Sequence, residues 1–414
     1  LEFRRVLFRS DNRGRKLLDG ASGLWTCPLG HGDPRIIDAI QKQYQIMDYV
    51  PAFQMAGEET FRLAHRITKY TPPGLGKVFF VNSGSEAVDT SLKIAIAYHR
   101  AKGEATRTRM IGRERAYHGG CIGGISVGGI PSNRKMFGAM MMPGVDHLPH
   151  TLNLSQMAFS RGQPKWGAHL ADELERIVAL HDASNIAAVI IEPVQGSTGV
   201  IVPPIGYLER IRELCTKYGI LLIFDEVITG FGRLAANFGA DRFGVIPDMI
   251  TFAKAITNGV IPMGGVIVRD DLYDTITSAG GQEQLIEFFH GYTYSGHPLA
   301  TAAAHACLDI FESDDIIART KKLAPVLEEA VHSLKGLPGI IDIRNCGMSA
   351  AFDLDPIPGK PGLRGMQVLE RCMDHGILVR ITSDTIALGP PFIASSNDIE
   401  SLVSTFADVI KKTF

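Results

Sequence analysis

Short, unbroken apolar runs are the feature that most limits how this chain can fold. Runs of strand length lie among helix-like segments, at Lys77–Val81, Ala187–Ile191, Ile220–Phe224, Met249–Phe252 and Gly264–Val268. A strand that is apolar on both faces needs cover on both sides, and helices alternating with such strands give a mostly parallel sheet. The pattern therefore predicts an α/β fold in which ligands bind beyond the carboxyl ends of the strands.

The pattern changes after Pro298. Helices are expected at Glu86–Arg100 and Tyr207–Lys217 in the first part, and the Gly/Met-rich stretch 119–144 is expected to be a loop. The later expected elements are the helices Leu299–Glu312, Ile316–Leu334 and Asn397–Thr413 and the strands Ile340–Arg344, Ser349–Asp353, Leu378–Arg380 and Thr385–Leu388. This change indicates a smaller α+β domain beginning near residue 297.

The overall composition narrows the class of protein. The chain has 42 lysine and arginine residues against 44 aspartate and glutamate residues, a formal net charge of −2. Nucleic-acid binders normally carry a clustered basic excess, so this balance argues against that class. No apolar run reaches the roughly 18–20 residues of a membrane helix, so no membrane partner is expected. The six cysteines form no Cys-x-x-Cys pair and no secretory signal is expected, which favours reduced thiols in a cytoplasmic protein.

Two polar groups follow apolar runs at positions suited to ligand binding. Ser83, Gly84 and Ser85 lie between a strand-like run and a helix, where backbone N–H groups, hydroxyls and the helix dipole bind phosphate. An ordinary serine N-cap is the alternative. Asp225 ends another run, where it could hold a ligand cation or cap a loop.

Two further residues complete the set. Lys254 directly follows an apolar run, where a lowered pKa would make its amine a nucleophile; a surface lysine is the alternative. Tyr117 and His118 precede a pair of glycines, so Tyr117 could stack on a flat ring or belong to a plain turn. Together, a phosphate-binding turn, an aromatic ring, an acid and a lysine are the groups that pyridoxal 5′-phosphate needs. This cofactor serves as an electron sink for a carbanion.

The sequence here resembles a known family, the class III aminotransferases of pyridoxal-phosphate fold type I. The motifs that carry the resemblance are FVNSGSEAVDTSLKIA, AYHGG, VIIEPVQGSTGV, LLIFDEVITGFGR, DMITFAKAITNG and GYTYSGHPLA. Stretches such as TRTRMIGRERAYHGG and GVDHLPHT are most similar to the omega-amino acid (β-alanine):pyruvate group. The resemblance implies a large domain with a mostly parallel sheet plus a smaller α+β domain. It also implies transfer of an amino group from an omega-amino acid or primary amine to pyruvate, giving an aldehyde or ketone and L-alanine.

The resemblance also assigns roles by position. Lys254 matches the lysine that forms a Schiff base with the cofactor, and Asp225 matches the partner of its ring nitrogen. The remaining cofactor positions match Ser83, Gly84 and Ser85 at the phosphate, Tyr117 with His118 at the ring face, and Glu192 and Val227 near the ring. Thr293 matches a threonine that reaches the phosphate of a neighbouring subunit, which implies a homodimer or homotetramer with shared sites. Trp25 matches a pocket-lining tryptophan, and Arg380 a mobile arginine that pairs with a substrate carboxylate.

Departures from the family pattern refine these expectations. Ser197 and Ile228 stand where the ornithine and GABA branch usually has Glu and Gln, which favours the pyruvate-using branch over an ornithine/GABA-type aminotransferase. Ala255 replaces a commoner Gly beside Lys254. Ser383 replaces a Gly, and it would strain the turn near Arg380 if that position needs a positive φ.

The expected domain division follows from the resemblance. Residues 11–44 would form an N-terminal part of the small domain, 45–296 the large cofactor-binding domain and 297–414 the C-terminal small domain. Residues 1–10, LEFRRVLFRS, are expected to be a non-native remnant standing where family members have a segment at the active-site entrance.

Other classes of function fit less well. Gly124–Gly128 formally matches the Gly-x-Ser-x-Gly motif of hydrolases around Ser126, but neither the strand nor the helix of a nucleophile elbow is expected there. Asp146, His147 and His150 have no partners at zinc spacing, so no metal is expected. A pyridoxal-phosphate decarboxylase or aminomutase remains an alternative within the same chemistry.

Overall fold

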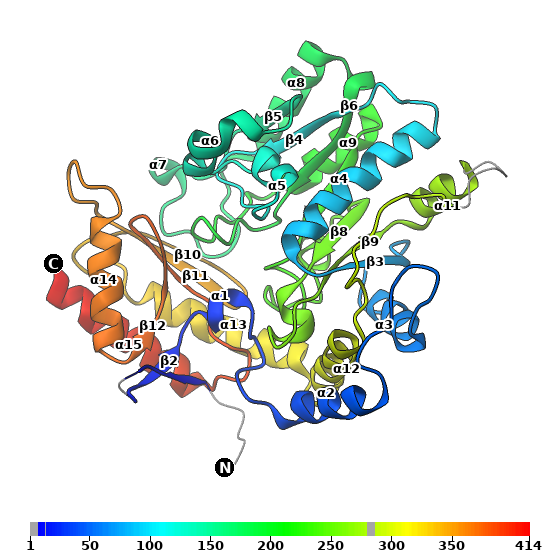
Figure 1. Cartoon of the computed structure of the whole chain (residues 1–414). Helices are drawn as coiled ribbons and strands as arrows, with labels where there is room; N and C mark the ends of the chain where they lie inside the picture. The colour runs from blue at the N-terminus through cyan, green and yellow to red at the C-terminus, as the bar shows by residue number, and fades with distance from the viewer. Residues whose placement is uncertain (1–6, 13, 280–285) are drawn as a thin grey trace.

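The computed structural model describes residues 7–12, 14–279 and 286–414. Residues 1–6 of the expected ten-residue remnant lie outside this range, whereas Phe8–Ser10 form strand β1. Two larger sheets and one small N-terminal sheet organise the described chain (Figure 1). The expected domain boundaries stay predictions.

A seven-stranded sheet forms the first part of the molecule, in the order β3-β9-β8-β7-β6-β4-β5. Its strands are β3 (Lys77–Val81), β4 (Arg109–Arg113), β5 (Val145–Leu148), β6 (Ile186–Ile191), β7 (Leu221–Asp225), β8 (Met249–Phe252) and β9 (Gly264–Val268). Strand β9 runs antiparallel to both of its neighbours, and the other pairs are parallel. The prediction of a mostly parallel sheet is therefore confirmed.

Helices cover both faces of this sheet, as the apolar strands require. Alternate residues of β7 point to opposite sides: Leu222 shares one core with Leu208 of α9 (Tyr207–Tyr218), while Leu221 shares another with Leu92 of α4 (Gly84–Ala101). The other helices of this part are α3 (Glu58–Thr68), α5 (Ile122–Val127), α6 (Pro131–Phe137), α7 (Leu154–Met157), α8 (Glu173–His181), α10 (Gly239–Phe243) and α11 (Asp270–Ala279). Short 3₁₀ turns are η1 (Gly138–Met140), η2 (Ala168–Asp172), η3 (Ala183–Asn185) and η4 (Lys254–Thr257).

The C-terminal part contains a four-stranded antiparallel sheet in the order β10-β11-β14-β13. These strands are β10 (Ile340–Cys346), β11 (Ser349–Leu354), β13 (Arg380–Thr382) and β14 (Thr385–Leu388), and the helices are α12 (Pro298–Ser313), α13 (Ile316–His332), α14 (Leu363–Asp374) and α15 (Ser396–Thr413). Helix α13 packs against α15 and against β10. An antiparallel sheet with helices packed beside it, as seen here, is an α+β arrangement.

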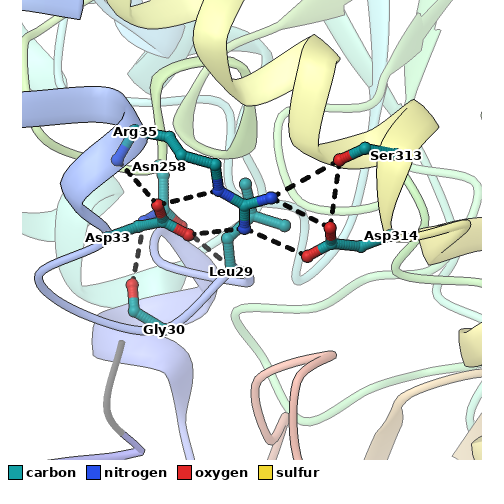
Figure 2. A network of polar contacts seen from close by, with 7 residues as sticks. All are labelled: Leu29, Gly30, Asp33, Arg35, Asn258, Ser313 and Asp314. Atoms are coloured by element: carbon teal, nitrogen blue, oxygen red, sulfur yellow. Dashed lines mark hydrogen bonds and ion pairs between the residues drawn. The ribbon is translucent and has the colours of Figure 1, made fainter. Parts of the chain in front are cut away.

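The N-terminal segment is tied to the C-terminal part. Strand β2 (Lys16–Asp19) pairs with β1 and, in parallel, with β12 (Ile377–Leu378). Helices α1 (Ser22–Trp25) and α2 (Pro34–Ile46) follow it. At the start of α2, Arg35 bonds both carboxylate oxygens of Asp33 and of Asp314, so α2 is fixed to the junction of α12 and α13 (Figure 2).

Three expected elements differ from the structure. Helix α4 begins at Gly84, two residues early, because the Ser83 hydroxyl accepts a hydrogen bond from Glu86 N–H and caps the helix. The expected loop 119–144 contains α5, α6 and η1; Pro131 occupies the first turn of α6, a position where its missing N–H is not needed. The single strand expected at Leu378–Arg380 is divided, with β12 and β13 in different sheets.

Candidate active site

A cavity of about 140 Å³ lies at the carboxyl end of the parallel strands. Residues that follow β4, β6, β7 and β8 meet there with the first turn of α4. The cavity is lined by Gly84, Ser85, Tyr117, His118, Gly119, Glu192, Asp225, Val227, Ile228, Ala253 and Lys254. The structure therefore brings together most of the side chains expected at the cofactor, although they come from distant parts of the sequence.

Asp225 is buried at the end of β7, with 5% of its surface exposed. One carboxylate oxygen lies 2.7 Å from His118 Nδ1, and the other accepts hydrogen bonds from Thr251 Oγ1 at 3.0 Å and Val227 N–H at 3.2 Å. A carboxylate only accepts, so His118 Nδ1 carries the proton in this contact. These contacts fix the carboxylate at the base of the cavity, facing a position suited to a protonated ring nitrogen.

Lys254 adopts a left-handed backbone conformation, with φ at +51°, directly after β8. Such strain in a residue that is not glycine gathers at functional sites. Burial above all, aided by the charges of Arg380 and Arg233 and opposed by Asp225, lowers the pKa of Lys254 to about 8. At pH 7 a pKa of 8 leaves about one tenth of the amine neutral, against about one part in three thousand for an ordinary lysine. The Lys254 amine is therefore a competent nucleophile near neutral pH.

The first turn of α4 forms one end of the cavity. Ser83 caps the helix, so the N–H groups of Gly84 and Ser85 stand at the positive end of an 18-residue helix. Gly84 has no room for a larger residue, because a Cβ there would lie 3.0 Å from the Val227 methyl groups, and a Cβ on Gly119 would collide with Ser85. The glycines keep a space open where backbone N–H groups can meet a phosphate.

Tyr117 borders the cavity from the segment after β4, and 40% of its surface is exposed. The buried Glu192 holds this segment, since its carboxylate accepts hydrogen bonds from Tyr117 N–H at 2.9 Å and from Gly196 N–H at 3.0 Å. Burial raises the pKa of Glu192 to about 7, with His118 opposing and Asp225 adding to the rise. Glu192 thus positions the Tyr117 backbone and the loop that carries Ser197.

Arg380 and Trp25 lie beside the cavity and contact each other. The Arg380 guanidinium carbon is 5.3 Å from the centroid of the Trp25 ring, within the range of a cation–π contact. Burial lowers the pKa of Arg380, with Tyr117 opposing, and its Nε has no hydrogen-bond partner among the described residues. Trp25 and Arg380, the two residues expected to bind the substrate, are therefore in contact with each other. The positive charge of this pair, on Arg380, is partly desolvated.

The segment that presents Trp25 is a single left-handed helical turn. Ser22, Gly23, Leu24 and Trp25 have φ values of +46°, +53°, +69° and +59°, and Trp25 N–H and Thr26 N–H bond the carbonyls four residues earlier. A left-handed turn costs about 1–2 kcal/mol for each residue with a Cβ. No local pattern predicts this turn, since among its four residues only Gly23 adopts such a conformation readily.

Thr293 lies apart from this cavity. It is exposed, and its carbonyl accepts a hydrogen bond from the Tyr49 hydroxyl at 3.1 Å. The Tyr49 and Tyr294 rings are 6.1 Å apart, and Phe53 lies against Gly291. We call Tyr49, Phe53, Thr293 and Tyr294 the Thr293 face; its three aromatic side chains are between 39% and 60% exposed.

The departures from the family pattern have clear structural settings. Ile228 lines the cavity, and the Ser197 carbonyl accepts a hydrogen bond from Thr382 on β13 at 2.7 Å. Ala255 is buried in η4 and has no positive φ, so a Cβ is tolerated there. Ser383 has φ at +54°, which confirms the expected strain in the β13–β14 turn.

The hydrolase alternative is wrong on geometric grounds. Ser126 is buried within α5, where its hydroxyl donates to the Ile122 carbonyl at 2.6 Å and accepts from Met142 N–H at 2.8 Å. It therefore caps local backbone and faces no cavity. No group of three His, Cys, Asp or Glu side chains in the described ranges could hold a metal ion. No helix of the described chain has both the length and the apolar character to cross a bilayer.

Sequence reasoning missed several residues that shape the site. Thr251 bonds Asp225 because the two are register partners on β8 and β7, and the order of the strands alone does not give this register. Asn258 follows the Lys254 turn, and its side chain bonds Leu29 N–H and Gly30 carbonyl, joining this turn to the segment after Trp25 (Figure 2). Asn258 has φ at +51°, and asparagine tolerates that conformation.

The cavity suits a flat, phosphate-bearing aldehyde. A helix start kept open by glycines suits the phosphate, a buried carboxylate with fixed partners suits a ring nitrogen, and a lysine with a lowered pKa suits an aldehyde carbon. This donor set fits pyridoxal 5′-phosphate.

Comparison with known proteins agrees with the geometry. The sequence model of the aminotransferase class-III family matches residues 5–410. The chain is 55% identical to an omega-aminotransferase of Caulobacter vibrioides, covering 96% of this chain and 90% of that protein. It is 48% identical to a beta-alanine–pyruvate aminotransferase of Pseudomonas aeruginosa, covering 97% and 89%.

Solved structures give the same result. An (S)-enantioselective omega-transaminase from Thermomicrobium roseum superposes with a TM-score of 0.92 at 33% identity, covering 99% of this chain and 92% of that one.

The gamma-aminobutyrate transaminase 2 of Solanum lycopersicum is less similar in sequence than the omega-aminotransferases above, at 36% identity. The cofactor of these enzymes is pyridoxal 5′-phosphate. The family match, the similar relatives and the cavity chemistry agree that this chain is a pyridoxal-phosphate-dependent enzyme of the class-III aminotransferase family.

Proposed function

We propose that this aminotransferase moves an amino group from an omega-amino acid such as β-alanine, or from a primary amine, to pyruvate. The products are an aldehyde or ketone and L-alanine. The observation that carries the proposal is the left-handed Lys254, with its pKa lowered to about 8, in one cavity with Asp225. The names of the relatives at 48–55% identity support this choice of substrates.

Each residue of the cavity has a distinct task in this proposal. When bound, pyridoxal 5′-phosphate supplies an aldehyde that condenses with amines and a ring that withdraws electrons from the substrate carbon. Gly84 and Ser85 would hold its phosphate, Tyr117 and Val227 would border its ring, and Asp225 would accept from its ring nitrogen. The Lys254 amine, neutral in a useful fraction, takes the proton from the amine-bearing carbon and returns it as an acid.

The substrate carboxylate is assigned to Arg380. Its guanidinium is partly desolvated, and its Nε has no hydrogen-bond partner among the described residues, so a two-pronged contact with a carboxylate is favourable. A donor without a carboxylate would leave Arg380 on Trp25. This arrangement lets one site accept both β-alanine and a simple amine.

The test is a donor panel with the Lys254→Ala variant as control. Purified protein should be yellow, alanine should bleach that band and pyruvate should restore it. Lys254→Ala should lose at least about a thousandfold in rate, because both the nucleophile and the proton carrier are gone. A colourless Lys254→Ala protein with undiminished transamination would contradict the proposal.

We also propose a homodimer or homotetramer in which the Thr293 face completes the cavity of a neighbouring subunit. The exposed aromatic side chains of this face support an interface, since large exposed apolar patches commonly mark contact sites. Size-exclusion chromatography with light scattering tests the assembly, and a monomer at micromolar concentration would contradict it.

We place the enzyme in the cytoplasm. All six cysteines are free thiols and five of them are buried, which matches a reducing compartment. Fractionation of the producing cells, with immunodetection of the protein, tests this assignment. Recovery in a secreted fraction would contradict it.

A further inference from the structure

The left-handed turn that carries Trp25 has a support of its own. We propose that Asp19, Ser22 and Gly389 are positioning residues that hold Trp25 as the resting place of Arg380, and so set how well the enzyme discriminates carboxylate substrates from simple amines. The inference rests on the proposed function, because it assumes that Arg380 binds the substrate carboxylate. It assigns a role to residues that lie outside the cavity.

Asp19 holds the start of the turn. Its buried carboxylate accepts hydrogen bonds from Ala21 N–H at 3.0 Å and Gly23 N–H at 3.0 Å, and lies 2.9 Å from His31 Nε2. Burial pushes the pKa of Asp19 up, but the His31 contact and the backbone N–H groups together hold it below its ordinary value. The carboxylate is therefore bound most tightly in its charged form, and it compensates for strain that the backbone cannot relieve.

Ser22 joins the turn to two other parts of the molecule. Its hydroxyl donates to the Gly389 carbonyl at 2.6 Å and accepts from Arg233 Nη2 at 3.2 Å. Arg233 is itself buried, and its Nη1 donates to the carbonyls of Met348 and Pro390. The turn is thus anchored to the segment between β7 and α10, which carries Arg233, and to the loop after β14.

Gly389 lies directly against the indole ring of Trp25. A Cβ at this position would collide with the Trp25 ring at Nε1 and Cδ1, and Gly389 N–H donates to the Gly20 carbonyl at 2.7 Å. The ring is therefore held on one side by backbone that has no side chain. Its indole N–H has no partner among the described residues, so shape alone, and no hydrogen bond, fixes its orientation.

This arrangement explains how Arg380 can move. A cation–π contact is weaker than a two-pronged bond to a carboxylate, so a substrate carboxylate can draw the guanidinium from the ring. The contact still depends on the ring staying in one place. If the turn relaxes, Arg380 loses its resting place, and the affinity for carboxylates changes while the chemistry at Lys254 does not.

Tryptophan fluorescence gives a direct test, because the chain has only two tryptophans, Trp25 and Trp166. In a Trp166→Phe holoenzyme, Trp25 emission is followed while propionate, an unreactive carboxylate, is added. We expect a saturable change in emission as Arg380 leaves the ring. In Asp19→Asn and Gly389→Ala versions of that protein we expect the starting emission to shift and the response to propionate to fall by at least half.

Kinetics supply the second readout. We expect Asp19→Asn to lower the KM for β-alanine by up to about tenfold, because the contact with Trp25 competes with the substrate carboxylate for Arg380, while the single-turnover rate with benzylamine stays within about twofold of the parent. Asp374→Asn is the matched control: its carboxylate pairs with Arg15 on the surface of the same region, and both readouts should stay unchanged. An equal loss for both donors, or an unchanged Trp25 emission in Asp19→Asn, would overturn the inference.

The two proposals fail in different ways. If the parent enzyme does not use β-alanine with pyruvate, the proposed function is wrong, and the Trp25 emission of Asp19→Asn and Gly389→Ala still decides whether these residues position the ring. If the parent is active and both variants match it in every readout, only the positioning role is wrong.

Discussion

The base of the cavity and the Thr293 face are built in opposite ways. At the base, Asp225 is buried and its oxygens contact His118, Thr251 and Val227 of the same chain. At the Thr293 face, the side chains of Tyr49, Phe53 and Tyr294 are between 39% and 60% exposed. A buried polar group must find its partners within the fold, whereas exposed aromatic rings are stabilised by cover from outside. The residues of the base thus find their partners within one chain, whereas the exposed rings of the face fit the proposed contact with a second subunit.

The largest expected effect concerns the base. Asp225→Ala should lower transamination by at least about a thousandfold, since the ring nitrogen would lose its charged partner. Mixing Asp225→Ala protein with Lys254→Ala protein should recover nothing, because both residues serve the cavity of their own chain. Initial rates before and after subunit exchange measure this. Recovery in the mixture would show that the base is shared between chains.

The face gives the opposite expectation. Thr293→Ala should be strongly impaired, and mixing it with Lys254→Ala should restore about one quarter of the parent rate, because half of the dimers are hybrids with one intact site of two. The Asp225→Ala mixture is the internal control. With subunit exchange verified by native mass spectrometry, an absence of recovery would mean that Thr293 does not act across an interface.

A third prediction concerns pH. The rate at which cofactor-free enzyme takes up pyridoxal 5′-phosphate should rise about tenfold per pH unit and level off near pH 8, because only the neutral Lys254 amine reacts and burial lowers its pKa to about 8. Arg380→Ala should move this bend to higher pH, since it removes a positive charge that favours the neutral amine. Stopped-flow absorbance measures both profiles. A bend that stays in place in the variant would exclude Arg380 from the electrostatics of the cavity base.

The smallest effect is expected at the turn that carries Arg380. Ser383→Gly should raise the free energy of unfolding by about 0.5–1 kcal/mol, because glycine adopts the φ of +54° without strain. Ser383→Ala keeps a Cβ and should give no gain. Urea denaturation compares the two variants, and activity should not change. Equal stability of the two variants would show that this turn stores no strain.

The residues at the base of the cavity could be predicted from the sequence because the ends of strands are easy to locate. Asp225 and Lys254 directly follow runs that became β7 and β8, and parallel strands place such residues at one edge of the sheet. Thr251 was missed because its role depends on strand register. The divided strand at Leu378–Arg380 was missed because an apolar run does not reveal which sheet each residue joins.

The Trp25 turn could not have been predicted by any local rule. Its residues have no common preference for left-handed backbone, and its supports come from Asp19, Gly389 and Arg233, which are far apart in the sequence. Tertiary contacts outweigh propensity at this point. The resemblance singled out Trp25 and Arg380 separately, and it carried no information on their mutual contact or on what holds Trp25 in place.

The parallel pairing of β2 with β12 has a consequence for the order of events during synthesis. Leu18 and Asp19 pair with Ile377 and Leu378, whereas every strand of the seven-stranded sheet is complete by Val268. On the ribosome, the sheet that supports the cofactor can assemble while β12 is still unmade, and contacts between such distant residues form late. Asp19 is also the residue that supports the Trp25 turn. The strands around the candidate cofactor cavity can therefore form during synthesis before the Trp25 turn, with its proposed role in substrate selection, is held in place.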